Sequence, residues 1–409
     1  MVKPVNFAFG LEARRESFEI GAGEPGSYIR GTFTTLPLAS QGFSGFRPAN
    51  VVDVDRNAVG AYIDVEGNLT EKLSADAAVR FEHYSDFGEN TSGKIAARYD
   101  FSPEFALRGS VSSGFRAPAL QQQYYTATSI LFINGVPFDT GTYPSTSPIG
   151  VALGGKALDP ETSMNYALGL VYRKGAFELT IDAYKIDVDN RIVLSETLTG
   201  SATAAPGTNA RVIYDLLSPL GASAARFFIN GVNTETVGLD IVAHYRITDD
   251  QAGTFDLTAA GNLNDLEVTR VPATSITILP TPTPLFARQA VLRFEKGTPR
   301  QKLTLQGDWS KENWGATVRT TFYGSVLSPG TTADGLNDTR TGVRGLVDVE
   351  ARYTFPIGVT ASLGADNLFD QYPNQIPRNL NTTSAAPFSG FSPFGFNGRY
   401  VYGRIAYKW

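Results

Sequence analysis

Two carboxylates on one stretch have the spacing that acid–base chemistry would need. Asp348 and Glu350 lie two residues apart, and Arg344 and Arg352 belong to the same alternate set of positions. Strand side chains alternate between two faces, so all four would project from one face of a strand. Two neighbouring acids could divide the roles of general acid and general base. The flanking cations favour a structural ladder of ion pairs instead, so we predict that the chain is not an enzyme.

Ligands for a transition metal are scarce. The chain has two histidines, His83 and His244, and no cysteine, and neither histidine has a second histidine or cysteine at ligand spacing. A protein zinc site needs three or four such ligands. The sequence also contains no nucleophile elbow, no phosphate-binding loop and no zincin motif. We therefore expect no metal, no catalytic residue and no cofactor.

The end of the chain shows what kind of element carries these side chains. In Gly398–Trp409, Val401 and Ile405 belong to an apolar alternate set, whereas Arg404 and Lys408 belong to the other set. A half-buried strand of a soluble sandwich would alternate in the same way. Aromatic residues at the strand ends and cations on the inner set favour a membrane barrel with interfacial girdles, because a dry core would not accept the cations.

The same alternation occurs fourteen times, with the charges consistently on one phase. A sheet that is apolar on one face and wet on the other predicts an all-β fold, an antiparallel transmembrane β-barrel. A change of phase near Tyr184 predicts either a bulge or an extension of that strand beyond the bilayer. The predicted strands cover about 5–19, 59–66, 73–82, 94–100, 105–112, 165–173, 177–184, 237–246, 255–264, 303–309, 314–322, 343–353, 359–366 and 398–409.

The connections between these strands alternate between short and long. Short periplasmic turns and long extracellular loops are typical of outer-membrane barrels, and this order places both chain ends on the periplasmic side. Arg288–Lys296 could be a further strand or a helix, and we assign it to a loop because one extra strand would make the count odd. The short connections are 67–72, 100–104, 173–176, 248–253, 310–313 and 356–358. The long connections are 21–57, 84–92, 114–163, 190–227, 268–300, 325–342 and 370–397.

Composition agrees with this fold and excludes other classes. Charged residues make up 18% of the 409 residues, below the roughly 25% that soluble chains carry. The formal net charge of −5 gives no general attraction to nucleic acid. No apolar run reaches the length of about 18 residues that a transmembrane helix needs. The first residues lack the apolar core of a secretory signal, so we expect the sequence to begin at a strand.

Aromatic residues are dense in two of the long connections. Tyr124 and Tyr125 follow a run of glutamines, and Phe391, Phe394 and Phe396 lie close together near the end of the chain. Aromatic side chains on exposed loops suit ligand capture. They could equally cover one another over the barrel mouth or form part of a girdle. Both interpretations stay open from the sequence.

Three segments carry a family resemblance. They are SSGFRAPALQ at 112–121, LDPETSMNYALGL at 158–170 followed by IDAYKIDVDNRI at 181–192, and GADNLFDQY at 364–372. In this order, at strand ends and before an aromatic terminus, they resemble the barrel of TonB-dependent outer-membrane receptors. The resemblance runs over essentially the whole chain, and its most specific parts are G-F-R-A-P and N-L-F-D.

The resemblance implies uptake of a scarce nutrient, such as a ferric siderophore, cobalamin, haem or a carbohydrate, across the outer membrane of a Gram-negative bacterium. It implies three partners: outer-membrane lipid, the TonB complex, and a small-molecule ligand or metal chelate. Such barrels have about 22 strands around a plug, so we expect 1–409 to be one partial barrel domain without the plug, the first strands or the TonB-contacting segment. The alternatives are a passive pore or structural barrel and, more weakly, an autotransporter or adhesin.

The candidate ligand-binding residues lie on the loops and the lumen wall. Besides the five aromatic residues named above, they include Arg116, in the G-F-R-A-P segment, and Arg404, on the inner phase of the last strand.

Overall fold

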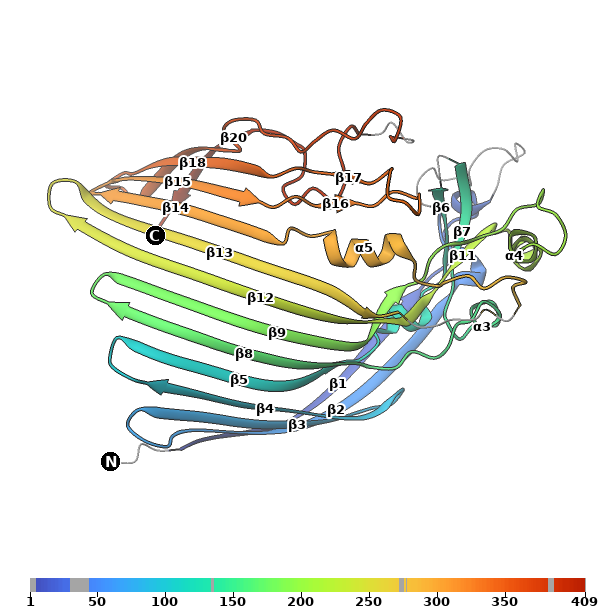
Figure 1. Ribbon diagram of the computed structural model, residues 1–409, viewed down its shortest axis with the longest axis horizontal. Coiled ribbons are helices and arrows are strands. Elements are labelled where there is room, and N and C mark those ends of the chain that lie inside the picture. The colour runs from blue at the N-terminus through green and yellow to red at the C-terminus, as the bar shows by residue number, and fades with distance from the viewer. Residues whose placement is uncertain are drawn as a thin grey trace.

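Fourteen antiparallel strands form one curved sheet, in which each strand pairs with its neighbours in chain order (Figure 1). The computed structural model describes residues 5–29, 44–133, 136–271, 276, 278–381 and 386–408. All fourteen predicted strands are confirmed. They are β1 (Asn6–Ile20), β2 (Val52–Asn68), β3 (Leu73–Tyr84), β4 (Gly88–Asp100), β5 (Phe105–Arg116), β8 (Glu161–Lys174), β9 (Phe177–Leu194), β12 (Phe228–Asp249), β13 (Gly253–Arg270), β14 (Gln301–Lys311), β15 (Trp314–Tyr323), β18 (Arg344–Thr354), β19 (Val359–Asp366) and β20 (Tyr400–Tyr407).

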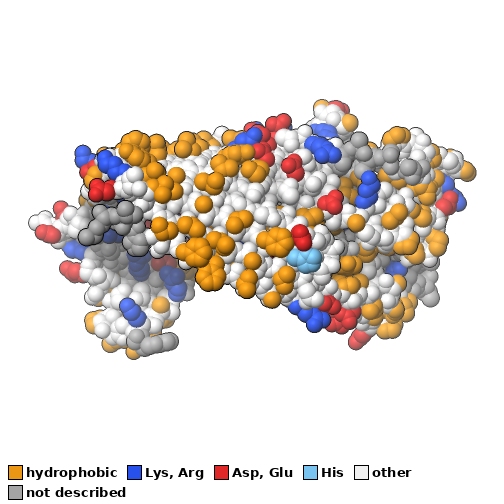
Figure 2. Space-filling model, turned by 90° about the horizontal axis from the view of Figure 1, so that it is seen from below, with side chains coloured by type: hydrophobic (Ala, Val, Ile, Leu, Met, Phe, Trp, Pro, Cys, Tyr) orange, Lys and Arg blue, Asp and Glu red, His pale blue; other side chains and the backbone are white. Residues whose placement is uncertain are grey.

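The register of the sheet turns the apolar phase of each strand to one surface. Phe9 pairs with Ile63, and Ile63 pairs with Val79, so these side chains form a row on the same face. Leu168, farther along the sheet, is 62% exposed on this face. Figure 2 views the molecule from below and shows apolar side chains spread over the middle of the sheet. Large apolar side chains that face outward in this way belong against lipid rather than water.

Aromatic rings border the apolar band at the end where the short turns lie. Phe101 contacts both Tyr99 and Phe105, with ring centroids 4.7 and 5.4 Å away. Trp314 and Tyr353, from β15 and β18, lie 4.8 Å apart. Amphipathic rings at this level are the girdle that a membrane interface favours.

Charged residues border the band at its other end. On β12 the outward positions run from Tyr245 to Val237, which spans about 27 Å at ~3.4 Å per residue. The next outward side chain is Glu235, which pairs with Lys185 of β9 at 2.7 Å. The phase change predicted near Tyr184 is thus the extension of β9 beyond the band and not a bulge, since Tyr184 pairs in register with Gly238. The register shifts of this strand pair lie higher, between Asn230 and Thr234.

The loops separate by length as the sequence predicts, with one exception. Six hairpin turns lie at one end of the sheet and the long connections lie at the other (Figure 1). The prediction of a long loop at 84–92 was wrong, because β3 ends at Tyr84 and β4 already begins at Gly88. The first residues of β4 are polar on both faces, so an apolar alternation test cannot detect them. Arg288–Lys296 is confirmed as a loop segment and forms the helix α5.

The long loops carry short elements of their own. In β1–β2 they are α1 (Pro25–Tyr28) and η1 (Pro48–Asn50), and in β5–β8 they are α2 (Leu120–Tyr124), β6 (Ala127–Ile133), β7 (Val136–Thr142) and α3 (Pro148–Ala152). In β9–β12 they are β10 (Leu198–Thr199), α4 (Asn209–Leu217), η2 (Ser218–Leu220) and β11 (Ala224–Arg226), and the β15–β18 loop holds β16 (Leu327–Ser328) and β17 (Thr339–Arg340). Strands of two different loops combine in a second sheet of order β10-β11-β7-β6.

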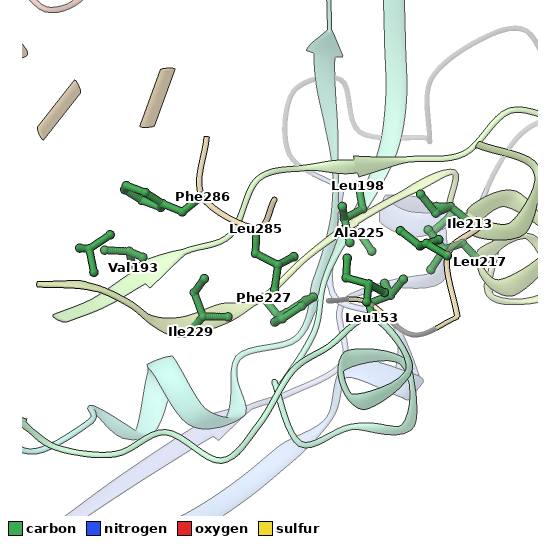
Figure 3. Packing of buried hydrophobic residues seen from close by; sticks show 14 residues of the cluster. Leu153, Val193, Leu198, Ile213, Leu217, Ala225, Phe227, Ile229, Leu285 and Phe286 are labelled. Atoms are coloured by element: carbon green, nitrogen blue, oxygen red, sulfur yellow. The ribbon is translucent and has the colours of Figure 1, made fainter. Parts of the chain in front are cut away.

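The hydrophobic core lies among these loops and the ends of β9 and β12 beside them. Phe227, Leu153 and Leu285 are fully buried and point toward one another, although they come from three different connections (Figure 3). Leu217 of α4 joins the same cluster. Fully burying such a side chain contributes roughly 1.5–3 kcal/mol relative to leaving it exposed. The three loops therefore fold together as one packed layer over the end of the sheet.

The two border strands of the wall, β1 and β20, each pair on one side only among the described residues. Unpaired backbone groups at such an edge cannot remain in lipid, where each costs several kcal/mol. None of the helices within the described ranges is long and apolar enough to cross a membrane.

We predict that the two ends of the wall lie on opposite sides of the membrane. Gln121 is exposed at the long-loop end and Asp250 is exposed in a short turn. Because the chain has no cysteine, single cysteines are specific probes. An impermeant maleimide added to intact cells should label Gln121→Cys and should not label Asp250→Cys. The reverse pattern would contradict the topology.

We also predict that neighbouring positions on β8 respond oppositely to a charge. Leu168 faces outward, whereas Ala167 lines an inward cleft of about 580 Å³ whose walls include Arg108 and Asp182. An arginine on the lipid face near the midplane costs about 2–4 kcal/mol. Leu168→Arg should lower the free energy of unfolding in bilayers by this amount, and Ala167→Arg should change it much less. Equal losses would refute the assignment of the two faces.

Candidate functional site

The inward face of the wall carries cations that pair with carboxylates across strands. Arg108 of β5 donates to Asp182 of β9 at 2.7 Å, and Arg80 of β3 donates to Glu12 of β1 at the same distance. Both pairs are partly exposed, and exposed pairs contribute at most about 1 kcal/mol each. Their arrangement neutralises the cations of the wall locally.

Glycines make room for side chains that cross the wall. A Cβ on Gly169 would come within 2.2 Å of Asp182, because the Arg108–Asp182 pair passes over β8 at this point. A Cβ on Gly238 would come within 2.1 Å of the Tyr184 ring. The Tyr184 hydroxyl accepts a hydrogen bond from Asn264 at 3.0 Å, two strands away from its own. These glycines thus let long side chains lie flat against the lumen face.

The ladder predicted around Glu350 is present only in part. Glu350 accepts hydrogen bonds from Arg404 at 2.9 Å and from the Tyr402 hydroxyl at 3.1 Å, and Arg352 lies 4.0 Å away. Asp348 instead accepts from the backbone N–H of Asn367 at 2.9 Å. Arg344 turns away from the ladder as well and donates to the Tyr372 carbonyl and the Asn374 side chain. Asp348 and Arg344 lie where β18 meets the β19–β20 loop, and polar groups of that loop replace the ladder as their hydrogen-bond partners.

At the mouth, cations pack on aromatic rings. Arg191 lies 5.1 Å from the Phe294 ring, Arg293 lies 5.8 Å from Phe391, and Lys302 lies 5.4 Å from Tyr323. No carboxylate pairs with any of these three cations within the described ranges of the chain. A cation over a ring keeps its charge available to a third group, which a salt-bridged cation does not.

The predicted aromatic residues of the β19–β20 loop belong to this region. Phe391 contacts Arg293 as described, and Phe394 lies 5.6 Å from Tyr323. Phe396 stacks on Phe388 at 6.0 Å, and Phe391 and Phe396 are 39% and 38% exposed. The structure thus connects Phe391 and Phe394 to the unpaired cations and leaves part of the aromatic surface open.

The other predicted residues have different surroundings. Tyr124 ends α2, and Tyr125 follows it with its ring edge on Phe46 at 6.2 Å. Arg116 donates to the largely buried carboxylate of Glu161 at 2.5 Å, which also accepts from the backbone of Ile192.

Arg404 belongs to the wall ladder and not to the mouth, through its pair with Glu350.

Sequence reasoning missed Arg191, Arg293 and Lys302. Each cation pairs with a ring from a different element, so no local spacing marks the contact. The only local signal lies in α5, where Arg293 and Phe294 are adjacent. Arg293 packs on the Phe391 ring, and the Phe294 ring packs against Arg191.

Among the described residues, no three histidine, aspartate or glutamate side chains come together as metal ligands would. His244 lies 3.3 Å from Asp256, and His83 lies 3.8 Å from Glu89, so each histidine has one carboxylate neighbour.

An ion pair joins α5 to the neighbouring loop. Arg288, the first residue of α5, donates to Asp338 at 2.6 Å and to the carbonyls of Gly330 and Thr332. Hydrogen bonding from Arg288 holds the pKa of Asp338 below its usual range, with a further contribution from the N–H of Gly330. The ionised form of Asp338 therefore stabilises the position of this loop beside the mouth.

This pair predicts a pH dependence. Because the pKa of Asp338 is lowered, its contribution is present above the ordinary aspartate value of about 3.9 and is lost as the pH falls through the lower pKa of the folded state. Leu336 is 81% exposed and can carry a fluorophore as Leu336→Cys. The fluorescence anisotropy of this label should decrease when the pH is lowered below about 4. In Asp338→Asn the anisotropy should already be low at neutral pH. Asp250→Asn, at the opposite end, should leave the titration unchanged, and an unchanged titration in Asp338→Asn would contradict this role.

Residues 4–368 match the family model described as TonB dependent receptor-like, beta-barrel. The chain belongs to this family.

Relatives in the family carry receptor and transporter names. The chain is 23% identical over 318 residues to the ferric enterobactin receptor PirA of Pseudomonas aeruginosa, which covers 76% of this chain and 36% of that protein. It is 36% identical over 72 residues to the vitamin B12 transporter BtuB of Vibrio cholerae, which covers 18% of this chain and 12% of that protein. The siderophore receptor PirA of Acinetobacter baumannii has the same fold, with a TM-score of 0.61 at 18% identity over 99% of this chain.

The chain spans about half the length of that solved receptor, 52%, and smaller shares of the two curated relatives. The relatives carry the names of receptors and a transporter, and the solved receptor has the same fold as this chain.

Proposed function

We propose that this chain forms the wall and mouth of an outer-membrane receptor that captures a negatively charged, aromatic ferric siderophore for TonB-dependent uptake. Its environment is the outer membrane of a Gram-negative bacterium, with lipid against the apolar band. Residues 1–409 act as one barrel domain, completed by further strands and a plug. The proposal includes no enzymatic step.

The observation that carries the proposal is the set of unpaired cations on aromatic rings at the mouth. Arg191, Arg293 and Lys302 each face a ring and have no carboxylate partner within the described ranges. A catecholate iron complex is both anionic and aromatic, so it can contact the cations and stack on the rings at once. A cation–π contact contributes about 0.5–1 kcal/mol at an exposed site and more when water is excluded.

The wall supports the same division of roles. Arg108 and Arg80 of the wall are matched by carboxylates, whereas Arg293 at the entrance is not. An anion would therefore be attracted first to the mouth. The names of the relatives agree with a siderophore and also with vitamin B12 as ligand classes. We assign ligand contact to Phe391 and Phe394, which adjoin the cations, ahead of Phe396, Tyr124 and Tyr125.

A binding measurement tests the proposal. Ferric enterobactin, a neutral ferric hydroxamate and cyanocobalamin would be titrated against the folded chain in detergent, with quenching of intrinsic fluorescence as the signal. We expect the anionic chelate to bind at least tenfold more tightly than the other two. Arg293→Gln combined with Lys302→Gln should remove about 1–2 kcal/mol of this binding, from two cation–π partners.

The matched control is Arg98→Gln. Arg98 pairs with Asp100 at 2.8 Å on the wall near the short turns, away from the mouth. Its substitution should leave the affinity unchanged. Tighter binding of cyanocobalamin than of the ferric chelates would reject the siderophore assignment, and equal losses in the mouth and wall variants would reject the mouth as the site.

A further inference from the structure

Among the described residues of the wall, one arginine is buried, and it lies at the long-loop end. The side chain of Arg56, on β2, is 4% exposed, whereas that of Arg80 on the neighbouring strand is 32% exposed. A cation without water requires partners that replace its hydration. The partners of Arg56 therefore show what the residue holds in place.

Its five partner residues come from three stretches of chain: β1, the end of β3 with the β3–β4 turn, and the segment before α2. Arg56 donates to Glu16 of β1, to Asp86 in the β3–β4 turn at 3.4 Å, and to the Pro118 carbonyl at 2.7 Å. Its guanidinium also lies 5.2 Å from the Tyr84 ring and 5.8 Å from the Phe87 ring. Those two rings stack on each other at 4.4 Å.

The last of these partners is the start of the loop that carries α2. Pro118 is fully buried and Leu120, the first residue of α2, is 6% exposed. Gln123 of α2 donates to Asp86 at 2.9 Å, so a second contact from the same cluster reaches the helix itself. The segment before α2 is thereby fixed to β2, and α2 is fixed to the β3–β4 turn.

We propose that Arg56 is a positioning residue, which fixes α2 and with it Tyr124 and Tyr125 over the mouth and so determines ligand affinity without touching the ligand. The residue acts through Pro118 and Asp86. The short β3–β4 turn has a role in this arrangement, because it places Asp86 and Phe87 beside Arg56 at the height of the loop. The link to affinity rests on the proposed function, whereas the position of α2 does not.

The first measurement concerns α2 alone. Nitroxide labels at Gln121→Cys and Glu89→Cys, both on exposed side chains, report the distance from α2 to the outer surface of β4. We expect a narrow distribution in the parent chain and a broad one after Arg56→Met. Arg56→Lys should restore part of the narrow population, because an ammonium keeps the charge but not the fork of donors. An unchanged distribution in Arg56→Met would overturn the proposal.

A milder variant covers the case in which Arg56→Met fails to fold. Gln123→Ala removes the contact between α2 and Asp86 and leaves the pair of Arg56 with Glu16 intact. Gln123→Ala should broaden the same distance distribution. The variant should still change its gel mobility on heating, as folded barrels do. Arg98→Met, at the opposite end of the wall, is the control and should not broaden it.

The second measurement concerns affinity for ferric enterobactin. Arg56→Met and Gln123→Ala should each weaken binding by about tenfold, as loss of preorganisation does, and Arg56→Lys by less. If the distance distribution of α2 broadens but the affinity for ferric enterobactin does not change, the inferred effect of Arg56 on affinity is overturned and the proposed function stands. If the distance distribution of α2 broadens but the parent chain binds none of the three test ligands, the proposed function is rejected and Arg56 remains the anchor of α2.

Discussion

Hydrogen bonding between neighbouring strands is the interaction on which the rest of this molecule depends. Lipid offers no partner to a backbone N–H or C=O group, so the wall is stable only where each strand lies beside another. The fourteen strands satisfy this requirement in unbroken chain order, and six of their hairpins are closed by short turns at the same end. Among the described residues, the outer edges of β1 and β20 are the ones left without a neighbouring strand.

Once the backbone is paired, the two faces of the sheet follow separate rules. The outward face is apolar between a girdle of rings and a border of charges, as Tyr245 and Glu235 mark on β12. The inward face accepts charge, and arginines such as Arg80 and Arg108 pair with acids on nearby strands. Gly169 and Gly238 permit this matching, because a side chain of a neighbouring strand can cross over them.

The mouth differs from the wall in how it treats its cations. Arg293 and Lys302 pack on Phe391 and Tyr323 and have no acid partner within the described ranges. The loops that carry such groups have a core of their own around Phe227 and Leu285, so they form a packed layer and not separate tethers. Arg56 anchors a further loop to the wall. Charge at the mouth is thus presented on a supported surface, which suits recognition of an anion.

The sequence by itself determined the wall, because a strand with one face in lipid must alternate with a period of two. Each of the fourteen predicted strands could be found from that period, and α5 could be kept out of the wall by parity. The polar start of β4 could not be found, since it lies above the apolar band and carries no alternation. Tertiary structure alone decided the site. Phe391 was visible as an aromatic residue in a loop, but Arg293 became its partner only through the packing of α5 against a loop about a hundred residues later in the chain. The burial of Arg56 was equally invisible, because its five partners come from segments that have no fixed spacing in sequence and meet only in the folded wall.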